Sequence, residues 1–404
     1  MTGSPIDSCD RPERMRRLAT TINTCVTALS CEKERSSNLA QQLQGACEEL
    51  LHQITNPRDY LLNLAQGHRI EAALQCITRF QLATIIPPHG AISLGEIALR
   101  ANLPPQKCGR ILRLLITAHI FDEPTPGAFA HNRTSLFLRD EQIHGMVAYY
   151  TGESLRVASF LADALDHWPD SQQRNETALN LAYNTPLPKF DFFATEPERA
   201  ARFSRAMMGM ASHDRFGLHH LIGAFDWAGL PPGATVVDVG ASSGHCSHAL
   251  ATAFEHLNFV VQDLEGTVGN SQASRLKFMA HDFFRPQPVI ADIYLLRWIL
   301  HDYPDAEASA ILRAQASVLR DGARIMIMDG VMMPPGVQPR SVERAYRQVD
   351  MAMMMMLNSR ERDLSEWRTL FHQVDPRLRL VSTCKPLESS LSVTVLELTG
   401  SERP

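Results

Sequence analysis

Hydrophobic residues follow two different spacings along the 404-residue chain, and the spacing changes near residue 230. Before that point, apolar positions recur mostly every three or four residues, which predicts amphipathic helices. After it, stretches long enough for helices alternate with short apolar runs of strand length, namely "TVVDVG", "NFVVQDL", "ADIYLLRWIL", "ARIMIMDGV" and "LSVTVLEL". This alternation predicts a doubly wound, mainly parallel α/β sheet over residues 231–404. Ligands of such sheets bind at the carboxyl ends of the strands, a rim that would carry Gly240, Asp263, Arg297, His301 and Asp329.

Three mostly helical segments are expected before the sheet. Residues 1–60 form an extension that cannot build a core alone and therefore packs on the rest of the chain or on a second subunit. The pattern of residues 61–140 predicts three helices and a short hairpin. Ser93 stands three residues before Glu96, which is the spacing of a capping box with Ser93 as the N-cap of a helix. Residues 141–230 are rich in aromatic and methionine side chains, a minority of which can line a pocket for a flat ligand.

Charge and composition narrow the possible partners. The formal net charge is -5, and no run of basic residues provides a field for nucleic acid. A helix-turn-helix followed by a small wing often binds DNA. Here the second helix of that motif offers only Lys107, Arg110 and Arg113 as basic residues, which favours a structural or dimer-forming role. The eight cysteines are scattered without zinc-like spacing, so we expect free thiols and no metal.

The first residues and the longest apolar runs of the sequence indicate where in the cell the protein is expected. The first residues, "MTGSPIDSCDRPERMRR", lack the apolar run of a signal peptide, and no stretch approaches the ~20 apolar residues of a membrane span. We therefore expect a cytoplasmic protein with a small-molecule or protein partner.

The stretch "TVVDVGASSGHCSHAL" supports two readings. Gly240, Ser242 and Gly244 match the G-x-S-x-G elbow of a serine hydrolase, in which Ser242 is the nucleophile. An elbow also needs earlier strands and an oxyanion-hole loop, whereas here the first strand of the α/β part carries the glycines. A buried strand that ends at small residues before a helix is also how a nucleotide-cofactor loop begins. The context favours the cofactor loop.

The acidic residues near the loop indicate which cofactor would bind. Asp263 ends the second strand, 19 residues beyond Gly244, where a carboxylate accepts hydrogen bonds from ribose hydroxyls. The loop lacks the last glycine of G-x-G-x-x-G, and Asp238 beside it would repel a phosphate and attract a cation. S-adenosylmethionine, a nucleoside with a sulfonium and an ammonium, fits both features.

Six segments, in order, resemble the S-adenosylmethionine-dependent O-methyltransferases of the plant caffeate and flavonoid type and their fungal secondary-metabolism relatives. They are "VVDVGASSGH", "FVVQDLEG", "MAHDFFRPQP", "ADIYLLRWILHDYPD", "ARIMIMDGVM" and "LNSRERDLSEWRTLF". The resemblance runs from about residue 60 to 400. It implies a Rossmann-like class I methyltransferase domain preceded by a winged-helix dimerisation domain, and a homodimer that helps to close the substrate pocket.

The resemblance also assigns site residues. It implies that Asp238 and Gly240 hold the methionine part of S-adenosylmethionine, that Asp263 holds the ribose, and that Asp282 and Phe283 flank the adenine. A basic residue that reaches the cofactor would be Arg297. The general base of the family corresponds to His301, and its two supporting acids correspond to Asp329 and Glu361.

The chemistry of those residues agrees with methyl transfer to a phenol. A phenol of pKa ~10 is protonated at neutral pH, so a histidine near its ordinary pKa of ~6.5 can take the proton as the oxygen attacks the methyl group. Neighbouring carboxylates fix the tautomer and stabilise the imidazolium. The substrate walls are expected to include Met207, Trp298 and one of Met353 and Met356, which suits a planar phenolic or polyketide-like acceptor.

Alternatives to methyl transfer remain open at this stage. Some fungal members of the family keep the cofactor site but act as pericyclases or dehydratases, with the sulfonium as a fixed charge. A hydrolase that uses Ser242 and a non-catalytic partner protein are two further possibilities. Retention of His301, Asp329 and Glu361 favours methyl transfer.

Overall fold

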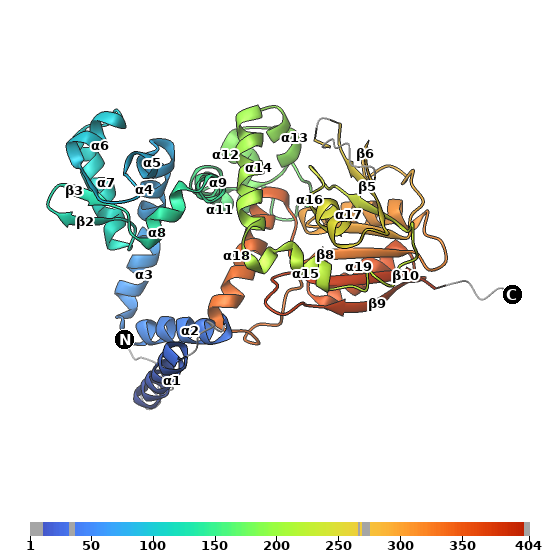
Figure 1. Cartoon of the computed structure of the whole chain (residues 1–404), viewed down its shortest axis with the longest axis horizontal. Helices are drawn as coiled ribbons and strands as arrows, with labels where there is room; N and C mark the ends of the chain where they lie inside the picture. The colour runs from blue at the N-terminus through green and yellow to red at the C-terminus, as the bar shows by residue number, and fades with distance from the viewer. Residues whose placement is uncertain (1–10, 32–36, 266, 269–274, 400–404) are drawn as a thin grey trace. The chain divides into compact units, whose positions relative to one another are not determined.

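The computed structural model describes residues 11–31, 37–265, 267–268 and 275–399, whose course Figure 1 shows. The chain forms two compact units, residues 1–155 with 333–347 and residues 156–332 with 348–404. Residues 1–10, where most of the expectation about a signal peptide applies, lie outside the described residues. Among the described helices, none combines the length and the apolar character that a membrane crossing requires.

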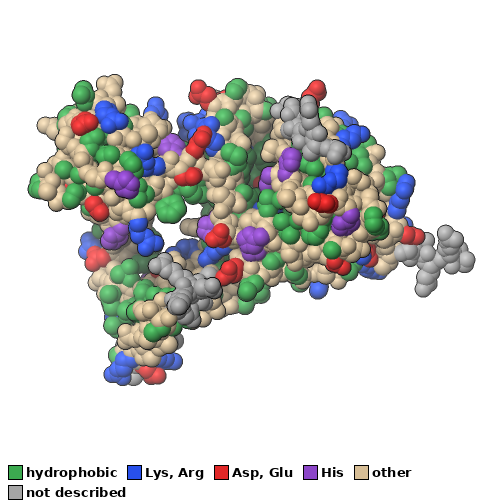
Figure 2. Space-filling view, viewed as in Figure 1, with side chains coloured by type: hydrophobic (Ala, Val, Ile, Leu, Met, Phe, Trp, Pro, Cys, Tyr) green, Lys and Arg blue, Asp and Glu red, His purple; other side chains and the backbone are tan. Residues whose placement is uncertain are grey.

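The first unit begins with a helical hairpin that salt bridges hold together. Helices α1 (Arg11–Cys31) and α2 (Ser37–Ile54) pack on each other and lead into α3 (Pro57–Gln66). Arg14 lies 2.6 Å from the carboxylate of Glu49, and Arg340, at the start of α18, lies 3.0 Å from it. Large apolar side chains of α2 and α3 remain exposed, and hydrophobic atoms reach the surface of this part in Figure 2; they include Leu51, Ile54, Leu61, Leu62 and Leu64.

Four helices and a small three-stranded antiparallel sheet follow in the first unit, one short helix and one strand more than the sequence predicts. The helices are α4 (His68–Arg79), α5 (Leu82–Ile85), α6 (Leu94–Arg100) and α7 (Pro105–Thr117). The sheet has the order β1 (Ala91–Ser93), β3 (Ala128–Ala130), β2 (Asp122–Thr125). Ser93 is the N-cap of α6, because its side chain accepts a hydrogen bond from the Glu96 amide at 3.2 Å. The apolar faces of these helices enclose one core that includes Ile77, Leu112 and Phe129.

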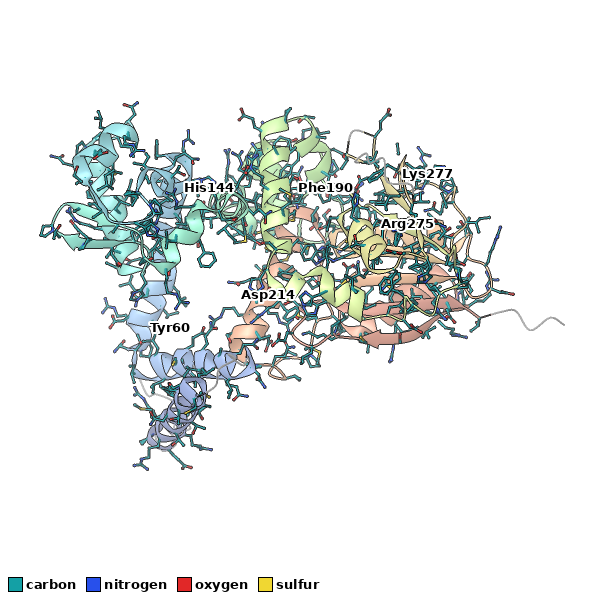
Figure 3. The ribbon with its side chains drawn as sticks, in the orientation of Figure 1. Tyr60, His144, Phe190, Asp214, Arg275 and Lys277 are labelled. Carbon is teal, nitrogen blue, oxygen red and sulfur yellow. The ribbon has the colours of Figure 1, made fainter. Side chains whose placement is uncertain are left out.

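Short helices precede the sheet of the second unit. They are α11 (Leu161–His167), α12 (Ala178–Tyr183), α13 (Lys189–Ala194), α14 (Pro197–Ala211) and α15 (Leu218–Gly223). Aromatic rings of α13 and α14 pack edge to face, with the centroids of Phe193 and Phe203 5.5 Å apart. Figure 3 labels Phe190 on α13. The predicted helical, aromatic-rich region is therefore present and partly packed on itself.

A seven-stranded sheet organises the second unit, in the order β6-β5-β4-β7-β8-β10-β9. The strands are β4 (Thr235–Val239), β5 (Asn258–Asp263), β6 (Leu276–Ala280), β7 (Ile293–Arg297), β8 (Arg324–Asp329), β9 (Leu378–Cys384) and β10 (Ser392–Leu398). The first five are parallel to one another, and β10 runs antiparallel to β8 and β9. The predicted mainly parallel sheet is confirmed, with β6 and β9 as additional edge strands.

Helices cover both faces of this sheet, which explains why its central strands are mostly apolar and buried on both faces. Alternate residues point to opposite faces: Val237 belongs to the core under α17 (Asp305–Ala316) and α19 (Leu364–Val374), whereas Val236 belongs to the core under α15 and α16 (His245–Ala253). Figure 1 shows the helices on either side of the strands. The result is a three-layer α/β/α domain whose carboxyl edge is free to carry a site.

Three buried glutamines connect β5 to the neighbouring elements. The amides of Gln262 and Gln287 bond to each other in both directions, at 2.9 and 2.8 Å. Gln287 also donates to Gln315 of α17 at 2.8 Å. All three side chains are buried, so their amides need protein partners, and they supply part of these hydrogen bonds to one another. This chain of amides holds the loop between β6 and β7 against the sheet.

Replacing Arg275 by Met should destabilise the second unit. Arg275, labelled in Figure 3, donates to the carbonyl oxygens of Ala251, Phe254 and Leu257 at the end of α16. Loss of the guanidinium leaves these carbonyls without a charged donor, and we expect the free energy of unfolding to fall by about 1–3 kcal/mol in urea titrations. The exposed Arg368→Met on α19 is the matched control and should change stability little; equal effects of the two variants would contradict the assignment.

Candidate active site

Four adjacent parallel strands bring the predicted site residues to one edge of the sheet. Strands β5, β4, β7 and β8 lie side by side and all point the same way, so their carboxyl ends meet. Asp263, Arg297 and Asp329 are the last residues of β5, β7 and β8, and Gly240 follows β4 directly. His301 lies in the short turn η4 (Leu300–Asp302) after β7. The rim expected from the sequence is thus assembled from residues far apart in the chain.

The glycine loop after β4 depends on left-handed backbone. Gly240, Ser242 and Gly244 have φ angles of 69°, 51° and 76°, a region that side chains disfavour. A Cβ atom on Gly240 would lie 2.6 Å from Cδ1 of Ile299 and 3.3 Å from Cε1 of Phe283. The backbone of Gly240 is therefore bare and bordered by two apolar side chains. Such a cradle fits close approach of a ligand to the main chain.

Asp238 lies under the loop as a buried carboxylate. Its Oδ2 accepts hydrogen bonds from the hydroxyl and the amide of Ser247, at 2.7 and 3.2 Å. Burial raises the pKa of Asp238 to about 6, although Ser247 and the nearby Arg297 favour the charged form. A cation beside Asp238, such as the ammonium group of S-adenosylmethionine, would offset this desolvation.

Asp263, Asp282 and Phe283 surround the loop on the side of β5. Asp263 accepts hydrogen bonds from the amides of Ser242 and Leu264, both at 2.7 Å, and burial raises its pKa. Its half-buried carboxylate keeps lone pairs for further donors such as ribose hydroxyls. Asp282 accepts from the Phe284 amide at 3.0 Å, which fixes the turn that carries Phe283. The set suits a nucleoside with two hydroxyls and a flat base.

Arg297 is held by neighbouring groups of the protein. Its Nη2 donates to the carbonyl oxygen of Phe216 at 2.6 Å, Nη1 lies 3.5 Å from Nε2 of His245, and the guanidinium stacks 4.5 Å from the ring of Trp298. Its buried Nε has no hydrogen-bond partner among the described residues. Trp298 has a φ of 57° and packs edge to face on Phe216 at 5.1 Å. Both residues therefore line the same end of β7.

His301 and Glu361 form a short, buried contact between two titratable side chains at the rim. Nδ1 of His301 lies 2.6 Å from Oε1 of Glu361, and only 12% of the histidine side chain is exposed. Burial lowers the pKa of His301, but Glu361, Asp302 and Asp329 outweigh it and raise the pKa to about 10. The expectation of an imidazole near its ordinary pKa is therefore wrong. Three carboxylates around one buried ring are the physical reason.

The segment around Glu361 fixes the turn that carries His301. Ser359 donates to the carbonyl oxygen of His301 at 2.5 Å, and the buried Arg362 donates to the carbonyl oxygens of Leu300 and Tyr303 at 3.0 and 2.8 Å. A Cβ on Gly330 would lie 2.4 Å from Oε2 of Glu361. The carboxylate therefore fits only because residue 330 has no side chain.

Asp329 is a buried acid whose two side-chain oxygens have no hydrogen-bond partner among the described residues. Burial raises its pKa to about 6; His301 opposes this shift, and Glu361 and Asp302 add to it. An unpartnered buried carboxylate costs stability. A residue that costs stability in this way is typically kept for its function and not for its contribution to folding.

The structure separates the expected substrate-wall residues by burial. Met207 on α14 is half-buried, Met353 on α18 (Arg340–Leu357) is half-buried, and Met356 is buried. The carbonyl oxygen of Met353 accepts from the Ser359 amide at 3.3 Å, which links it to the segment that holds His301. Of the two candidates on α18, Met353 has more surface to offer a ligand.

Several residues of the site escaped the sequence analysis. Asp302 follows His301 directly, and its Oδ1 lies 3.7 Å from Nε2 of the histidine. Ser359 and Arg362 stand in the same "NSRERD" segment as Glu361, so the segment was identifiable but their roles were not. Ser247 gave no signal. The described residues contain no group of three or more His, Cys, Asp or Glu that could hold a metal ion.

A three-layer fold with a glycine cradle and a half-buried acid at its carboxyl edge suits an enzyme with a nucleoside cofactor, and comparison with known proteins identifies the family. Residues 161–374 match the O-methyltransferase domain, and residues 62–140 match the O-methyltransferase dimerisation domain. The chain is 36% identical over 375 residues to the O-methyltransferase pgmB of Aspergillus terreus, covering 89% of this chain and 85% of that protein. The chain belongs to the S-adenosylmethionine-dependent O-methyltransferase family.

Solved structures agree with this fold. A crystal structure of OxaC superposes with a TM-score of 0.83 at 20% identity and covers 96% of this chain and all of that one. The structure of LepI in complex with S-adenosylmethionine gives a TM-score of 0.77 at 22% identity, over 95% and 99% of the two chains. The expected Rossmann-like fold is thereby confirmed. Membership of the O-methyltransferase family confirms the expected cofactor, S-adenosylmethionine.

Replacing Gly240 by Ala should weaken cofactor binding. The new methyl group would meet Ile299 and Phe283 in a left-handed backbone conformation, so we expect the affinity for S-adenosylhomocysteine to fall at least ~10-fold in calorimetric titration. Gly223→Ala in α15 is the control, since a Cβ there meets nothing within 4 Å. Unchanged affinity of Gly240→Ala would show that the loop does not hold the cofactor.

Replacing Asp329 by Asn should stabilise the protein at neutral pH. The folded state raises the pKa of Asp329 to about 6, so this group favours folding below its ordinary pKa of 3.8, and that contribution is lost as the pH rises through about 6. The advantage of Asn over Asp should therefore grow from pH 4 to pH 8, towards ~2–3 kcal/mol in urea unfolding. The exposed Asp321→Asn should show no such trend, and a pH-independent effect of Asp329→Asn would refute the buried-acid assignment.

Proposed function

We propose that the protein transfers the methyl group of S-adenosylmethionine to a hydroxyl oxygen of a planar phenolic or polyketide-like molecule in secondary metabolism, with His301 as general base. The observation that carries the proposal is the 2.6 Å contact between His301 and Glu361 at the carboxyl edge of the sheet, beside Asp329. The proposal is further supported by relatives such as the O-methyltransferase pgmB of Aspergillus terreus.

The cofactor-binding residues follow the geometry of the loop. Asp238 and Gly240 would hold the methionine part, Asp263 the ribose, and Asp282 with Phe283 the adenine. Arg297 would act from the end of β7. When bound, S-adenosylmethionine supplies an electrophilic methyl group on a positively charged sulfur. The carboxylates at the rim give this positive charge a favourable environment.

His301 and the acceptor share one proton during the reaction. Nδ1 of His301 donates to Glu361, which leaves Nε2 to bind the acceptor oxygen. S-adenosylmethionine would supply the methyl group to this oxygen, and Nε2 of His301 would take up the hydroxyl proton. Glu361 and Asp329 stabilise the resulting imidazolium.

The raised pKa of His301 has a consequence for binding. At neutral pH the free protein carries an imidazolium, because its pKa is about 10. A neutral phenol can bind in two ways, as a phenol beside the neutral imidazole or as a phenolate beside the imidazolium. In either case, one proton is released to the solvent. The imidazolium must lose its proton before the imidazole can act as general base.

A second candidate function is a pericyclic or dehydration reaction without methyl transfer. The observation that favours it is the same imidazolium, which can donate a hydrogen bond to an acceptor carbonyl instead of removing a proton. One solved structure of this fold, at 22% identity, is titled a pericyclic reaction enzyme. The two functions differ in the fate of the methyl group, because only transfer yields S-adenosylhomocysteine.

A homodimer is part of the proposal. Residues 62–140 match the O-methyltransferase dimerisation domain, and α3 leaves Leu61, Leu62 and Leu64 exposed in the single chain. Exposed apolar side chains on one helix suit burial against a second copy.

Replacing His301 by Ala should abolish most methyl transfer while S-adenosylhomocysteine still binds. With methyl-labelled S-adenosylmethionine and a panel of phenols, we expect transfer to fall by ~100- to 10,000-fold, and less for acidic phenols that ionise without a base. The exposed His372→Ala on α19 is the control and should retain transfer. An acceptor that changes mass or isomerises without gaining label would favour the second candidate function instead.

A further inference from the structure

Lys189 is a buried cation without a polar partner. Only 4% of the residue is exposed at the start of α13, and its ammonium group forms no hydrogen bond or ion pair with a described residue. Its Nζ lies 4.4 Å from the ring centroid of Phe203, 4.9 Å from that of Phe190 and 6.0 Å from that of Phe193. Lysine is almost never fully buried in proteins unless it is paired.

The aromatic rings only partly compensate for this burial. Phenyl faces attract a cation, but an ammonium has three N–H donors and the rings accept none of them as well as an oxygen does. Burial lowers the pKa of Lys189, and Asp302 acts in the opposite direction. The ammonium group of Lys189 therefore lacks an oxygen ligand, and the described residues do not provide one.

The position of Lys189 connects it to the proposed acceptor site. Asp302, the charged residue that favours its protonated form, follows His301 directly and lies 3.7 Å from Nε2 of that histidine. Met207, expected to line the substrate, lies on α14 one helical turn after Phe203. The charge of Asp302 thus acts on Lys189, which links the lysine electrostatically to the turn that carries His301.

We propose that Lys189 binds an ionised oxygen of the acceptor, so that the preferred acceptors are planar aromatic acids or comparably acidic enols that carry this anion besides the hydroxyl to be methylated. This inference rests on the proposed acceptor site beside His301. An oxygen anion would accept hydrogen bonds from the ammonium, and the phenyl rings around Nζ would contact the flat body of the ligand.

An anion suits this position better than a neutral polar group. A buried ammonium is stabilised most by a fully opposite charge that also accepts its hydrogen bonds. Asp302 does not fill this role, since its carboxylate forms no ion pair with Lys189 among the described residues. The ligand itself is left to supply the counter-charge.

The test compares two probes of the same ring system, 3-hydroxy-2-naphthoate and 2-naphthol, which differ only in the carboxylate. Their affinities for the full chain saturated with S-adenosylhomocysteine are measured by calorimetry. We expect the wild type to prefer the naphthoate by about 10-fold or more, as a charged hydrogen bond provides, and Lys189→Met to reduce the ratio to near one. Lys189→Arg should retain part of the preference.

Lys277→Met is the matched control. Lys277, labelled in Figure 3, is an exposed lysine of edge strand β6, so its replacement removes the same charge and should leave the ratio of affinities unchanged. A purely structural role of Lys189 would lower the affinities for both probes equally and leave their ratio intact. That result, or a wild type without preference for the acid, would overturn the inference.

The binding assay is independent of methyl transfer, so the two proposals fail separately. If labelled methyl groups never reach an acceptor but the acid preference depends on Lys189, the anion site stands and the reaction assignment falls. If methyl transfer depends on His301 but the ratio of affinities does not change in Lys189→Met, the reaction assignment stands and the anion site falls.

Discussion

The buried hydrogen bond between His301 and Glu361 is the constraint on which the site depends. Neither group is compatible with a nearly dry environment alone, and the imidazole requires a partner that fixes which nitrogen carries a proton. The surrounding chain supplies the geometry: Arg362 and Ser359 hold the backbone of the histidine turn, and Gly330 makes room for the carboxylate. The strand ends, the turn that carries His301 and the segment that carries Glu361 are thus arranged around this hydrogen bond.

The core of the fold was predictable because its strands are apolar on both faces. Strands β4, β5, β7 and β8 read as continuous hydrophobic runs, which only a sheet covered by helices on both sides produces. Edge strands β6 and β9 were missed because polar, partly exposed residues interrupt them, as in Lys277 and Ser382. Their pairing is set by neighbours in space rather than by their own pattern.

The candidate site was only partly predictable. Glycines and an acid at strand ends have fixed spacings in the sequence, so Gly240 and Asp263 could be named. The electrostatics could not, since Glu361 is 60 residues from His301 and the raised pKa of the histidine results from carboxylates on three segments. Lys189 was also not identifiable, because a lysine next to phenylalanines in a short helix reads as solvent-exposed until the packing is known.

The glutamine chain described in the fold restricts how this protein can evolve. Each of Gln262, Gln287 and Gln315 satisfies another's buried amide, so a change at one position leaves an unpaired polar group at the next. Replacing all three by apolar residues of similar size avoids that penalty, whereas single replacements do not. Among related sequences, the three positions should therefore vary together, and their joint identity should mark a branch of the family independently of its chemistry.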